Sequence, residues 1–354
     1  GWSWRRPSHA LLLVFSTYFY WWGERELVLV MLASTAIDFV CGLRIDQARR
    51  NGPPQTARRW LIVSIVANLG LLAFFKYAGF GVATLNSMIE FGGGVPLALP
   101  DIALPLGISF YTFQSMSYTI DVYRGTVPAT RSPVDFACFV TMFPQLVAGP
   151  IVRYADLAEQ LRARTLRVAS FATGVERFTT GLAKKVLIAN TVAVPADAAF
   201  GSSLADLDAA TAWLGIVCYS LQIYFDFSGY SDMAIGLGLM LGFRFVENFN
   251  YPYVSRTIQE FWRRWHISLS TWFRDYVYVP LGGNRQGAAR THRNLFLVFL
   301  LCGLWHGAAW NFVVWVLFHG GFLIAERSGL SGGLDKLWRP LQHAYSLLVV
   351  ALGW

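Results

Sequence analysis

Residues 294–325 read NLFLVFLLCGLWHGAAWNFVVWVLFHGGFLIA, a run of 32 residues without Asp, Glu, Lys or Arg. A run this long and apolar is typical of a membrane-spanning helix, which needs about 20 such residues. It nevertheless contains two histidines, His306 and His319. If a helix enters the bilayer near Asn294, a rise of about 1.5 Å per residue places His306 about 18 Å inside, near the middle of the hydrocarbon core. An ionisable group at that depth costs free energy, which makes His306 a candidate functional residue.

The rest of the chain has the same membrane character. Charged residues make up 14% and hydrophobic residues 55% of the 354 residues, whereas soluble globular proteins contain about 25% charged residues. Further uncharged runs cover residues 10–23, 60–75, 102–120, 136–152 and 209–225. We expect an all-α, polytopic integral membrane protein in which the shorter runs are tilted, broken or re-entrant.

No repeat or long polar linker divides the sequence, so we expect a single integral membrane domain over residues 1–354. The chain starts without Met and stops inside an apolar run. We therefore expect an N-terminal stretch and C-terminal spans to be missing from it.

The net charge of +8 comes from basic residues that cluster between apolar runs, within residues 44–59, 153–185 and 285–293. This is the positive-inside pattern, which places these segments in the cytoplasm and next to membrane lipid. Nucleic acid is not an expected partner. The four cysteines stand singly, without the spacing of a disulfide framework or a metal site, so we expect no metal.

Several segments depart from plain spans. Residues 143–150 combine two prolines with Gln145 and favour a re-entrant element. Residues 209–243 carry Asp226, Tyr230 and Asp232 near their centre and are expected to be broken or steeply tilted. Hydroxyl and amide side chains within 102–121 favour helix packing or a cavity wall.

Residues 258–279 have aromatic and aliphatic side chains at helical spacing, which predicts one amphipathic helix at the membrane face. Glu260 and Arg264 stand four residues apart on it, in the favourable orientation for an ion pair. His266 lies at the edge of the aromatic stripe, so it is expected to point toward protein or lipid.

Each candidate has a functional and a structural interpretation. A neutral His306 can accept a proton from a hydroxyl group, or it can be a structural histidine of the core. His266 can act as its partner in the same site, or it can be a structural histidine at the membrane interface. His319 lies on the other side of a straight helix, which favours a structural role unless residues 307–311 break the helix. Cys302 shares a face with His306, and packing is favoured over a nucleophilic role.

Five further residues are candidates for substrate binding: Asp226, Tyr230, Trp305, Arg263 and Arg264. A carboxylate within the membrane needs polar partners, and Asp226 and Asp232 therefore suit a proton relay, substrate contact or structural pairing equally. The arginines at 263, 264, 274 and 285 can meet donor phosphates or lipid headgroups. The sequence contains no Walker loop, GxSxG motif or HExxH motif, which argues against an ATP-driven pump, a hydrolase-type lipase and a zincin.

Five motifs together resemble the membrane-bound O-acyltransferase superfamily, and most of all the membrane subunits of bacterial alginate O-acetyltransferases. They are PLGISFYTFQ at 105–114, FPQLVAGPIVR at 143–153, YFDFSGYSDMA at 224–234, FWRRWHISLS at 261–270 and WHG at 305–307. They extend over almost the whole chain. The resemblance implies a multi-helix fold with a central tunnel, His306 as catalytic histidine and His266 at a second polar position of the family.

The resemblance further implies transfer of an acetyl group, with acetyl-CoA as donor and no bound cofactor, to a hydroxyl that serves exopolysaccharide O-acetylation. His306 would deprotonate or orient the hydroxyl, and His266 would assist at the acyl carbonyl. An exported acetyltransferase is the expected partner, and the bacterial inner membrane, crossed several times, the expected location. Two alternatives are an acyltransferase that uses a carrier protein, as in teichoic acid D-alanylation, and a transporter of polysaccharide or lipid precursors.

Overall fold

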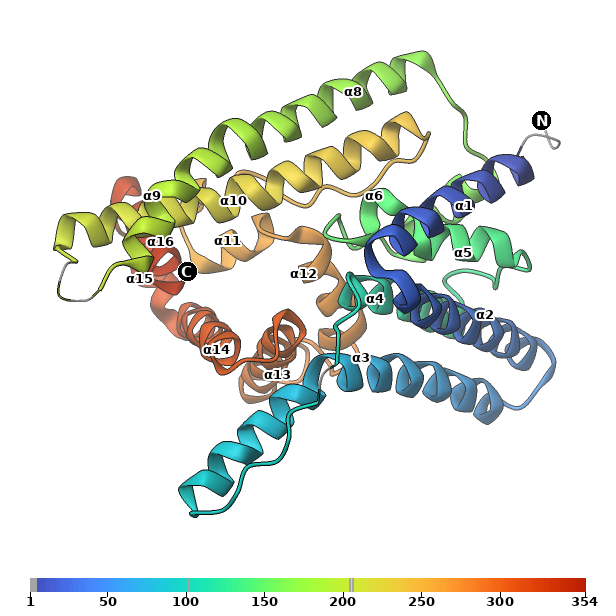
Figure 1. The fold of residues 1–354 in the computed structure, drawn as a ribbon, viewed down its shortest axis with the longest axis horizontal. Helices are drawn as coiled ribbons and strands as arrows, with labels where there is room; N and C mark the ends of the chain where they lie inside the picture. The colour runs from blue at the N-terminus through green and yellow to red at the C-terminus, as the bar shows by residue number, and fades with distance from the viewer. Residues whose placement is uncertain (1–4, 101, 204, 206) are drawn as a thin grey trace. The chain divides into compact units, whose positions relative to one another are not determined.

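The computed structural model describes residues 5–100, 102–203, 205 and 207–354, and these residues form helices without any strand. The expected domain over 1–354 also includes residues 1–4, 101, 204 and 206, which lie outside the described residues. The helices group into two compact units (Figure 1). The first comprises Gly1–Val147, Ile151–Arg164 and Gly307–Ala309, and the second comprises Ala148–Pro150, Thr165–His306 and Trp310–Trp354. The single domain stays a prediction.

The first unit is built from seven α-helices and a short 3-10 turn, η1 (Arg25–Leu27), within the described residues. The α-helices are α1 (Arg5–Glu24), α2 (Val28–Asn51), α3 (Pro54–Phe91), α4 (Ile108–Arg124), α5 (Pro133–Thr141), α6 (Phe143–Leu146) and α7 (Tyr154–Arg162).

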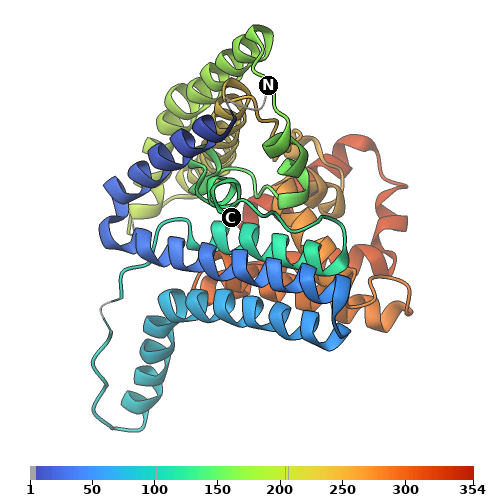
Figure 2. The same cartoon turned by 90° about the vertical axis from the view of Figure 1, so that its right-hand side faces the viewer.

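Helices α2, α3 and α4 run side by side (Figure 2), and a buried polar cluster joins them. Asp38 of α2 accepts hydrogen bonds from Ser64 Oγ at 2.6 Å and from Asn68 Nδ2 at 2.7 Å, both on α3. Ser115 of α4 donates a third. Buried polar groups need such hydrogen-bond partners. Helix α4 is buried along most of its length, which agrees with the helix packing expected for the polar side chains within 102–121.

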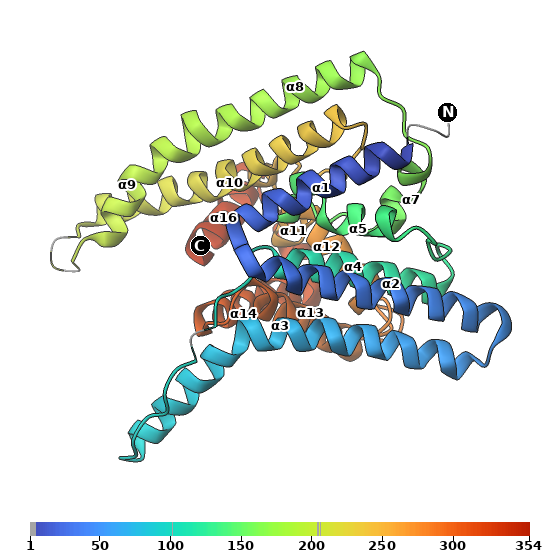
Figure 3. The same ribbon diagram turned by 45° about the vertical axis from the view of Figure 1, so that its right-hand side comes forward.

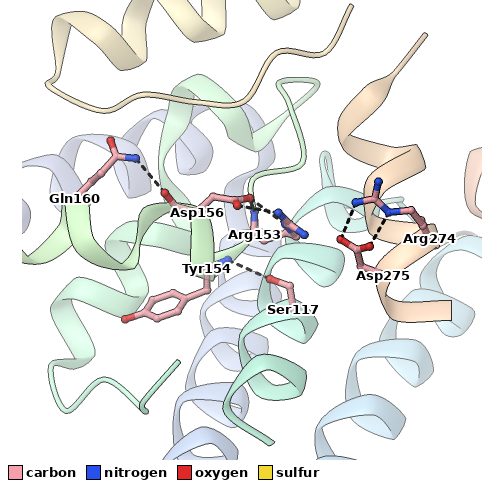
Figure 4. A network of polar contacts seen from close by, with 7 residues as sticks. All are labelled: Ser117, Arg153, Tyr154, Asp156, Gln160, Arg274 and Asp275. Atoms are coloured by element: carbon pink, nitrogen blue, oxygen red, sulfur yellow. Dashed lines mark hydrogen bonds and ion pairs between the residues drawn. The ribbon is translucent and has the colours of Figure 1, made fainter. Parts of the chain in front are cut away.

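A second polar network of the first unit anchors α7 (Figure 4). The Arg153 guanidinium bonds the Asp156 carboxylate at 2.9 Å, and the backbone N–H of Tyr154 donates to Ser117 Oγ of α4 at 3.2 Å. Residues 143–150, predicted to be re-entrant, form the four-residue helix α6 and then an irregular segment before α7. Its entry into the membrane stays a prediction.

The second unit holds the remaining helices. They are α8 (Val168–Ala183), η2 (Lys184–Ala189), α9 (Asn190–Gly201), α10 (Ala209–Met240), η3 (Pro252–Val254), α11 (Ile258–Arg264), α12 (Ile267–Phe273), η4 (Arg274–Tyr278), α13 (Ala288–His306), α14 (Trp310–Ala325), η5 (Glu326–Leu330), α15 (Ser331–Leu334) and α16 (Arg339–Gly353). Helices α8 and α10 run side by side (Figure 3), and their backbones approach closely at Gly181 and Gly229, where a Cβ atom would collide with the facing helix.

Helix α10 is continuous over its 32 residues, so of the two alternatives expected for 209–243 the break is wrong, and the steep tilt stays a prediction. The Asp208 side chain begins the helix by accepting the backbone N–H of Thr211 at 2.7 Å. No break is needed for Asp232, because Arg177 and Lys184 meet its carboxylate at 2.7 and 2.6 Å. The charge that suggested an interruption is compensated across the α8–α10 interface.

The uncharged run 294–325 forms two helices rather than one. Helix α13 begins at Ala288, six residues before the expected entry point, and ends at His306; α14 begins at Trp310. The two helices form an antiparallel hairpin, in which Gly303 faces Val316 and Gly320 faces Phe299. His306 therefore lies at the tip of a helical hairpin and not in the middle of a straight helix.

Among the described residues, three helical stretches are long and apolar enough to cross a membrane: Ser8–Asn51, Pro54–Phe91 and Trp310–Leu334. Together with the composition, they identify a membrane protein. The number of crossings, the central tunnel and the re-entrant elements stay predictions.

Candidate active site

A cavity of about 560 Å³ in the second unit brings His266 and His306 together. Its walls come from α11, α12, η4, the α13–α14 hairpin and η5. Its lining residues include Trp262, Arg263, His266, Arg274, Tyr278, Leu295, Cys302, His306, Trp315, Val316 and Arg327. The two histidines, forty residues apart in sequence, thus share one site.

The chain breaks at His266, so the single amphipathic helix expected over 258–279 is wrong. Helix α11 ends at Arg264, and His266 adopts a left-handed backbone conformation, φ 45° and ψ 54°, at the start of α12. That conformation is unfavourable for a residue with a Cβ atom and persists only where neighbours hold it. As expected, the His266 side chain points into protein: it is 2% exposed.

Hydrogen bonds around Asn248 determine which nitrogen of His266 carries the hydrogen. Asn248 Oδ1 accepts from the backbone N–H and the hydroxyl of Ser268, at 3.3 and 2.8 Å, and lies 3.1 Å from His266 Nδ1. Because an amide oxygen only accepts, Nδ1 must carry the hydrogen. In a neutral ring Nε2 is then an acceptor, and it has no partner among the described residues.

His266 remains neutral at ordinary pH. Burial lowers its pKa well below the usual value for histidine, and the nearby His306 lowers it further. The role expected at the acyl carbonyl needs an N–H donor at Nε2, and a neutral ring hydrogen-bonded through Nδ1–H has none there. The geometry therefore supports an accepting role for His266.

Trp305 packs between the two histidines. Its ring centroid lies 5.0 Å from that of His306 and 6.1 Å from that of His266, with interplanar angles of 82° and 61°. On its other side His306 meets the ring of Trp315 at 5.2 Å. These two rings restrict the orientation of His306. Trp305 is not among the lining residues of the cavity, and its substrate contact stays a prediction.

Three exposed arginines, Arg263, Arg274 and Arg327, line the same cavity from three different elements. Arg274 is paired with Asp275 at 2.7 Å (Figure 4), and Arg327 approaches the Tyr278 hydroxyl at 3.3 Å. Arg264 is not among the lining residues. Its guanidinium bonds Glu260 at 2.8 Å, which confirms the expected ion pair, and the backbone carbonyl of Asn250 at 3.1 Å.

Asp226 and Tyr230 are not among the lining residues of the cavity either. The Asp226 carboxylate pairs with Lys185 at 2.5 Å and is 46% exposed, and the Tyr230 hydroxyl bonds the backbone of Ala148. Asp226 and Asp232 thus have the polar partners that a carboxylate in this protein requires. A substrate contact for Asp226 or Tyr230 stays a prediction.

Two residues of the hairpin complete the surroundings. Cys302 is a free thiol that lines the cavity. Because the helix breaks at 307–309, His319 is not on the far side of a straight helix: its fully buried ring packs against Trp262 and Trp315, with centroids 5.1 and 5.5 Å away. A structural role for His319 and a packing role for Cys302 stay predictions.

Comparison with known sequences decides the family. The profile of the membrane-bound O-acyltransferase family matches residues 127–330, which include the whole site. The chain belongs to the membrane-bound O-acyltransferase family. It is accordingly an acyltransferase, which leaves the transporter without support.

Individual relatives agree with this assignment. The chain is 51% identical to a probable alginate O-acetylase, AlgI, of Azotobacter vinelandii, over 99% of this chain and 69% of that protein. It is 50% identical to the protein of the same name from Pseudomonas aeruginosa, over 99% and 67%. A more distant relative, the teichoic acid D-alanyltransferase of Bacillus subtilis, is 30% identical over 70% and 65%. The chain thus spans about two thirds of the length of these relatives.

Sequence reasoning missed Asn248 and Arg327. Asn248 stands eighteen residues before His266, in the segment ENFNYP at 247–252, where polar residues interrupt an aromatic stretch. Arg327 directly follows the uncharged run and Glu326. Both were visible as polar residues beside apolar ones, but nothing in their spacing links them to the histidines.

Proposed function

We propose that this acyltransferase moves an acetyl group from cytoplasmic acetyl-CoA to an acceptor hydroxyl that serves O-acetylation of an alginate-like exopolysaccharide. The observation that carries the proposal is the cavity itself, in which two histidines and three arginines line one space. The histidines suit proton transfer at a reacting hydroxyl, and the arginines suit the phosphates of a donor.

The dimensions of the hairpin support coenzyme A as the donor's carrier. Along α13 the lining residues extend from Leu295 to His306, and from Val316 to Arg327 along α14 and η5. Each stretch advances eleven residues, about 16 Å at the helical rise. Coenzyme A likewise separates its phosphates from its thioester by an extended pantetheine arm. Phosphates near Arg327 would therefore place the thioester toward His306.

The chemistry follows from that placement. His306 takes the proton from the acceptor hydroxyl as its oxygen attacks the thioester carbonyl carbon. The new C–O bond forms, the C–S bond breaks, and the proton passes from His306 to the departing thiolate. The apolar walls around the histidines keep water from competing with the acceptor.

The basic segment 285–293 includes the first turns of α13, at the open end of the hairpin, where Arg327 also lies. If this loop is cytoplasmic, as the positive-inside pattern indicates, a cytoplasmic donor enters at the arginines. We assign the protein to a bacterial inner membrane, which it crosses several times. The names of the alginate O-acetylase relatives support an acceptor of the alginate type. We infer an exported acetyltransferase as partner from the family resemblance of the motifs alone.

A carrier-protein donor is the second candidate, favoured by the likeness to teichoic acid D-alanyltransferase. A carrier protein presents its acyl group on the same kind of phosphopantetheine arm, with one phosphate. The arginines alone do not separate the two donors, and the assay below does.

The test uses the purified protein in lipid nanodiscs with labelled acetyl-CoA, in the presence and absence of the exported partner. We expect label to reach the acceptor, and His306→Ala to abolish the transfer while the protein remains in the membrane. Transfer at the wild-type rate by His306→Ala would remove His306 from the mechanism. Acylation from a loaded carrier protein, with no use of acetyl-CoA, would select the second candidate.

A further inference from the structure

We propose that Asn248 is a positioning residue for acyl transfer, which holds His266 in the tautomer with hydrogen on Nδ1 so that Nε2 accepts a hydrogen bond from a hydroxyl of the acceptor substrate. This inference rests on the proposed function, which supplies the acceptor. It goes beyond that function by assigning the direction of the hydrogen bond at His266 and the residue that imposes it.

The orientation of the Asn248 amide is fixed on both sides. Its Nδ2 donates to Ser231 Oγ of α10 at 3.0 Å, while its Oδ1 accepts from the backbone N–H of Ser268. Rotating the amide by 180° would place its NH₂ group against that backbone N–H. The amide oxygen therefore faces His266, and only Nδ1–H can complete the bond.

Asn248 also holds the backbone that presents the ring. Its backbone carbonyl oxygen accepts a hydrogen bond from the backbone N–H of Ile267 at 2.9 Å. Ile267 directly follows His266, whose backbone conformation is left-handed. The asparagine is fully buried. One residue thus fixes the backbone turn, the orientation of the imidazole and its tautomer, and precise placement of this kind is what a hydrogen-bond acceptor for a substrate requires.

Nε2 is left as a buried acceptor without a partner among the described residues. An unsatisfied buried polar atom costs free energy, which a ligand can recover by donating a hydrogen bond. A hydroxyl can donate to Nε2, whereas a thioester carbonyl cannot. The position therefore favours the acceptor substrate over the acyl group as the ligand of His266.

The first test reads the tautomer directly and needs no catalysis. ¹⁵N spectra of histidine-labelled full-length protein in nanodiscs should show one imidazole with protonated Nδ1 and unprotonated Nε2 at neutral pH, and this signal should vanish in His266→Gln. A protonated Nε2 would overturn the inference. If the tautomer is as expected while no acetyl transfer occurs with any donor, the proposed function fails and the positioning geometry stands.

The second test separates positioning from simple stability through kinetics. Asn248→Asp keeps the acceptor oxygen but adds a negative charge, which raises the pKa of His266. His306 lowers the pKa of this ring, and Arg263, Arg274 and Arg327 line the same cavity. These groups are the same in the wild type and the variant, so the difference between the two profiles reports the added charge. Since neutral His266 is the active form, the acid limb of the kcat/KM profile should move to higher pH.

Asn248→Ala removes the acceptor oxygen and should lower kcat/KM for the acceptor roughly 10- to 100-fold, with the KM for acetyl-CoA unchanged. Asn190→Asp, an exposed Asn-to-Asp change in the same unit, should leave the profile in place. An unshifted acid limb in folded Asn248→Asp, or equal changes in the KM values for donor and acceptor in Asn248→Ala, would reduce Asn248 to a structural residue.

Discussion

The indole ring of Trp305 stands nearly perpendicular to the imidazole of His306, with the ring centroids 5.0 Å apart and an interplanar angle of 82°. An edge-to-face arrangement is the favoured geometry of aromatic pairs and contributes about 0.5–1.5 kcal/mol beyond the area that it buries. Trp305 is also 7% exposed. Trp305 thus packs against the imidazole of His306 and restricts its orientation.

Replacing Trp305 should test that contact. Trp305→Phe keeps a ring beside His306 and should retain kcat within a few-fold. Trp305→Ala opens a void, should destabilise the protein by about 3–5 kcal/mol and should lower kcat by at least tenfold. Turnover and thermal unfolding in detergent measure both effects. Trp338→Ala, at a 73% exposed position, is the control, and normal kcat in Trp305→Ala would show that the ring does not position His306.

The arginines should divide by whether they line the cavity. Arg263→Gln and Arg327→Gln should each raise the KM for acetyl-CoA roughly tenfold, because a charge-assisted contact with phosphate is lost. Arg264→Gln should leave that KM unchanged, since Glu260 and the Asn250 carbonyl hold its guanidinium. Initial rates at several salt concentrations provide the measurement. An equal rise in KM for all three variants would indicate a diffuse charge effect instead.

Two aspartates on one helix should differ in their contribution to stability. Asp232→Asn leaves Arg177 and Lys184 without their 8% exposed carboxylate and should cost roughly 1–3 kcal/mol, less than a fully buried pair because both cations are partly exposed. Asp226→Asn breaks an exposed pair and should cost at most about 1 kcal/mol. Thermal unfolding compares the two directly. The expectation fails if Asp226→Asn lowers the melting temperature as much as Asp232→Asn does.

Cys302 offers a probe of the cavity. Cys41, Cys138 and Cys218 are buried, whereas Cys302 is partly exposed and lines the cavity. A thiol in apolar surroundings reacts slowly, so a small maleimide should modify Cys302 slowly at neutral pH and faster at higher pH, yet ahead of the three buried cysteines. The modification should block transfer, and coenzyme A should slow it. Cys302→Ala should remain active and resist the reagent, since the proposed mechanism gives the thiol no part in the reaction. Loss of activity in that variant would revive a nucleophilic role for Cys302.

The lowered pKa of His266 has a consequence for stability. Below about pH 6.5 the unfolded chain binds a proton at this residue that the folded protein does not, so folding becomes less favourable as pH falls. The loss amounts to at most about 1.4 kcal/mol per pH unit. Unfolding measured from pH 7.5 to 5 should show a steeper decline in the wild type than in His266→Gln. Parallel declines would mean that folded His266 titrates normally.

The sequence predicted those features that depend on residue type and local spacing. An uncharged run of 32 residues requires an apolar environment wherever it folds, and the Glu260–Arg264 pair follows from helical geometry alone. The WHG motif at 305–307 located one half of the site by resemblance, and the motif ending at Ser270 located the other.

The features that were missed depend on contacts between segments. The break at His266 is unfavourable for that residue alone and exists because Asn248, from a different segment, holds the following backbone N–H groups. Helix α10 stays continuous because cations on α8 and η2 compensate Asp232. Arg264 is turned away from the cavity by its ion pair, while Arg327 lines it because the hairpin returns. Periodicity within one segment contains none of this information.

The hairpin of α13 and α14 also changes how the chain must be threaded through the bilayer. Its two arms return to the same end, where His292 Nε2 and Ser328 Oγ lie 3.5 Å apart. If both arms cross the bilayer, a topology count that treats 294–325 as one crossing places α16 on the wrong side of the membrane. With the return included, cysteine tags at 286 and 332 should be labelled from the same aqueous compartment.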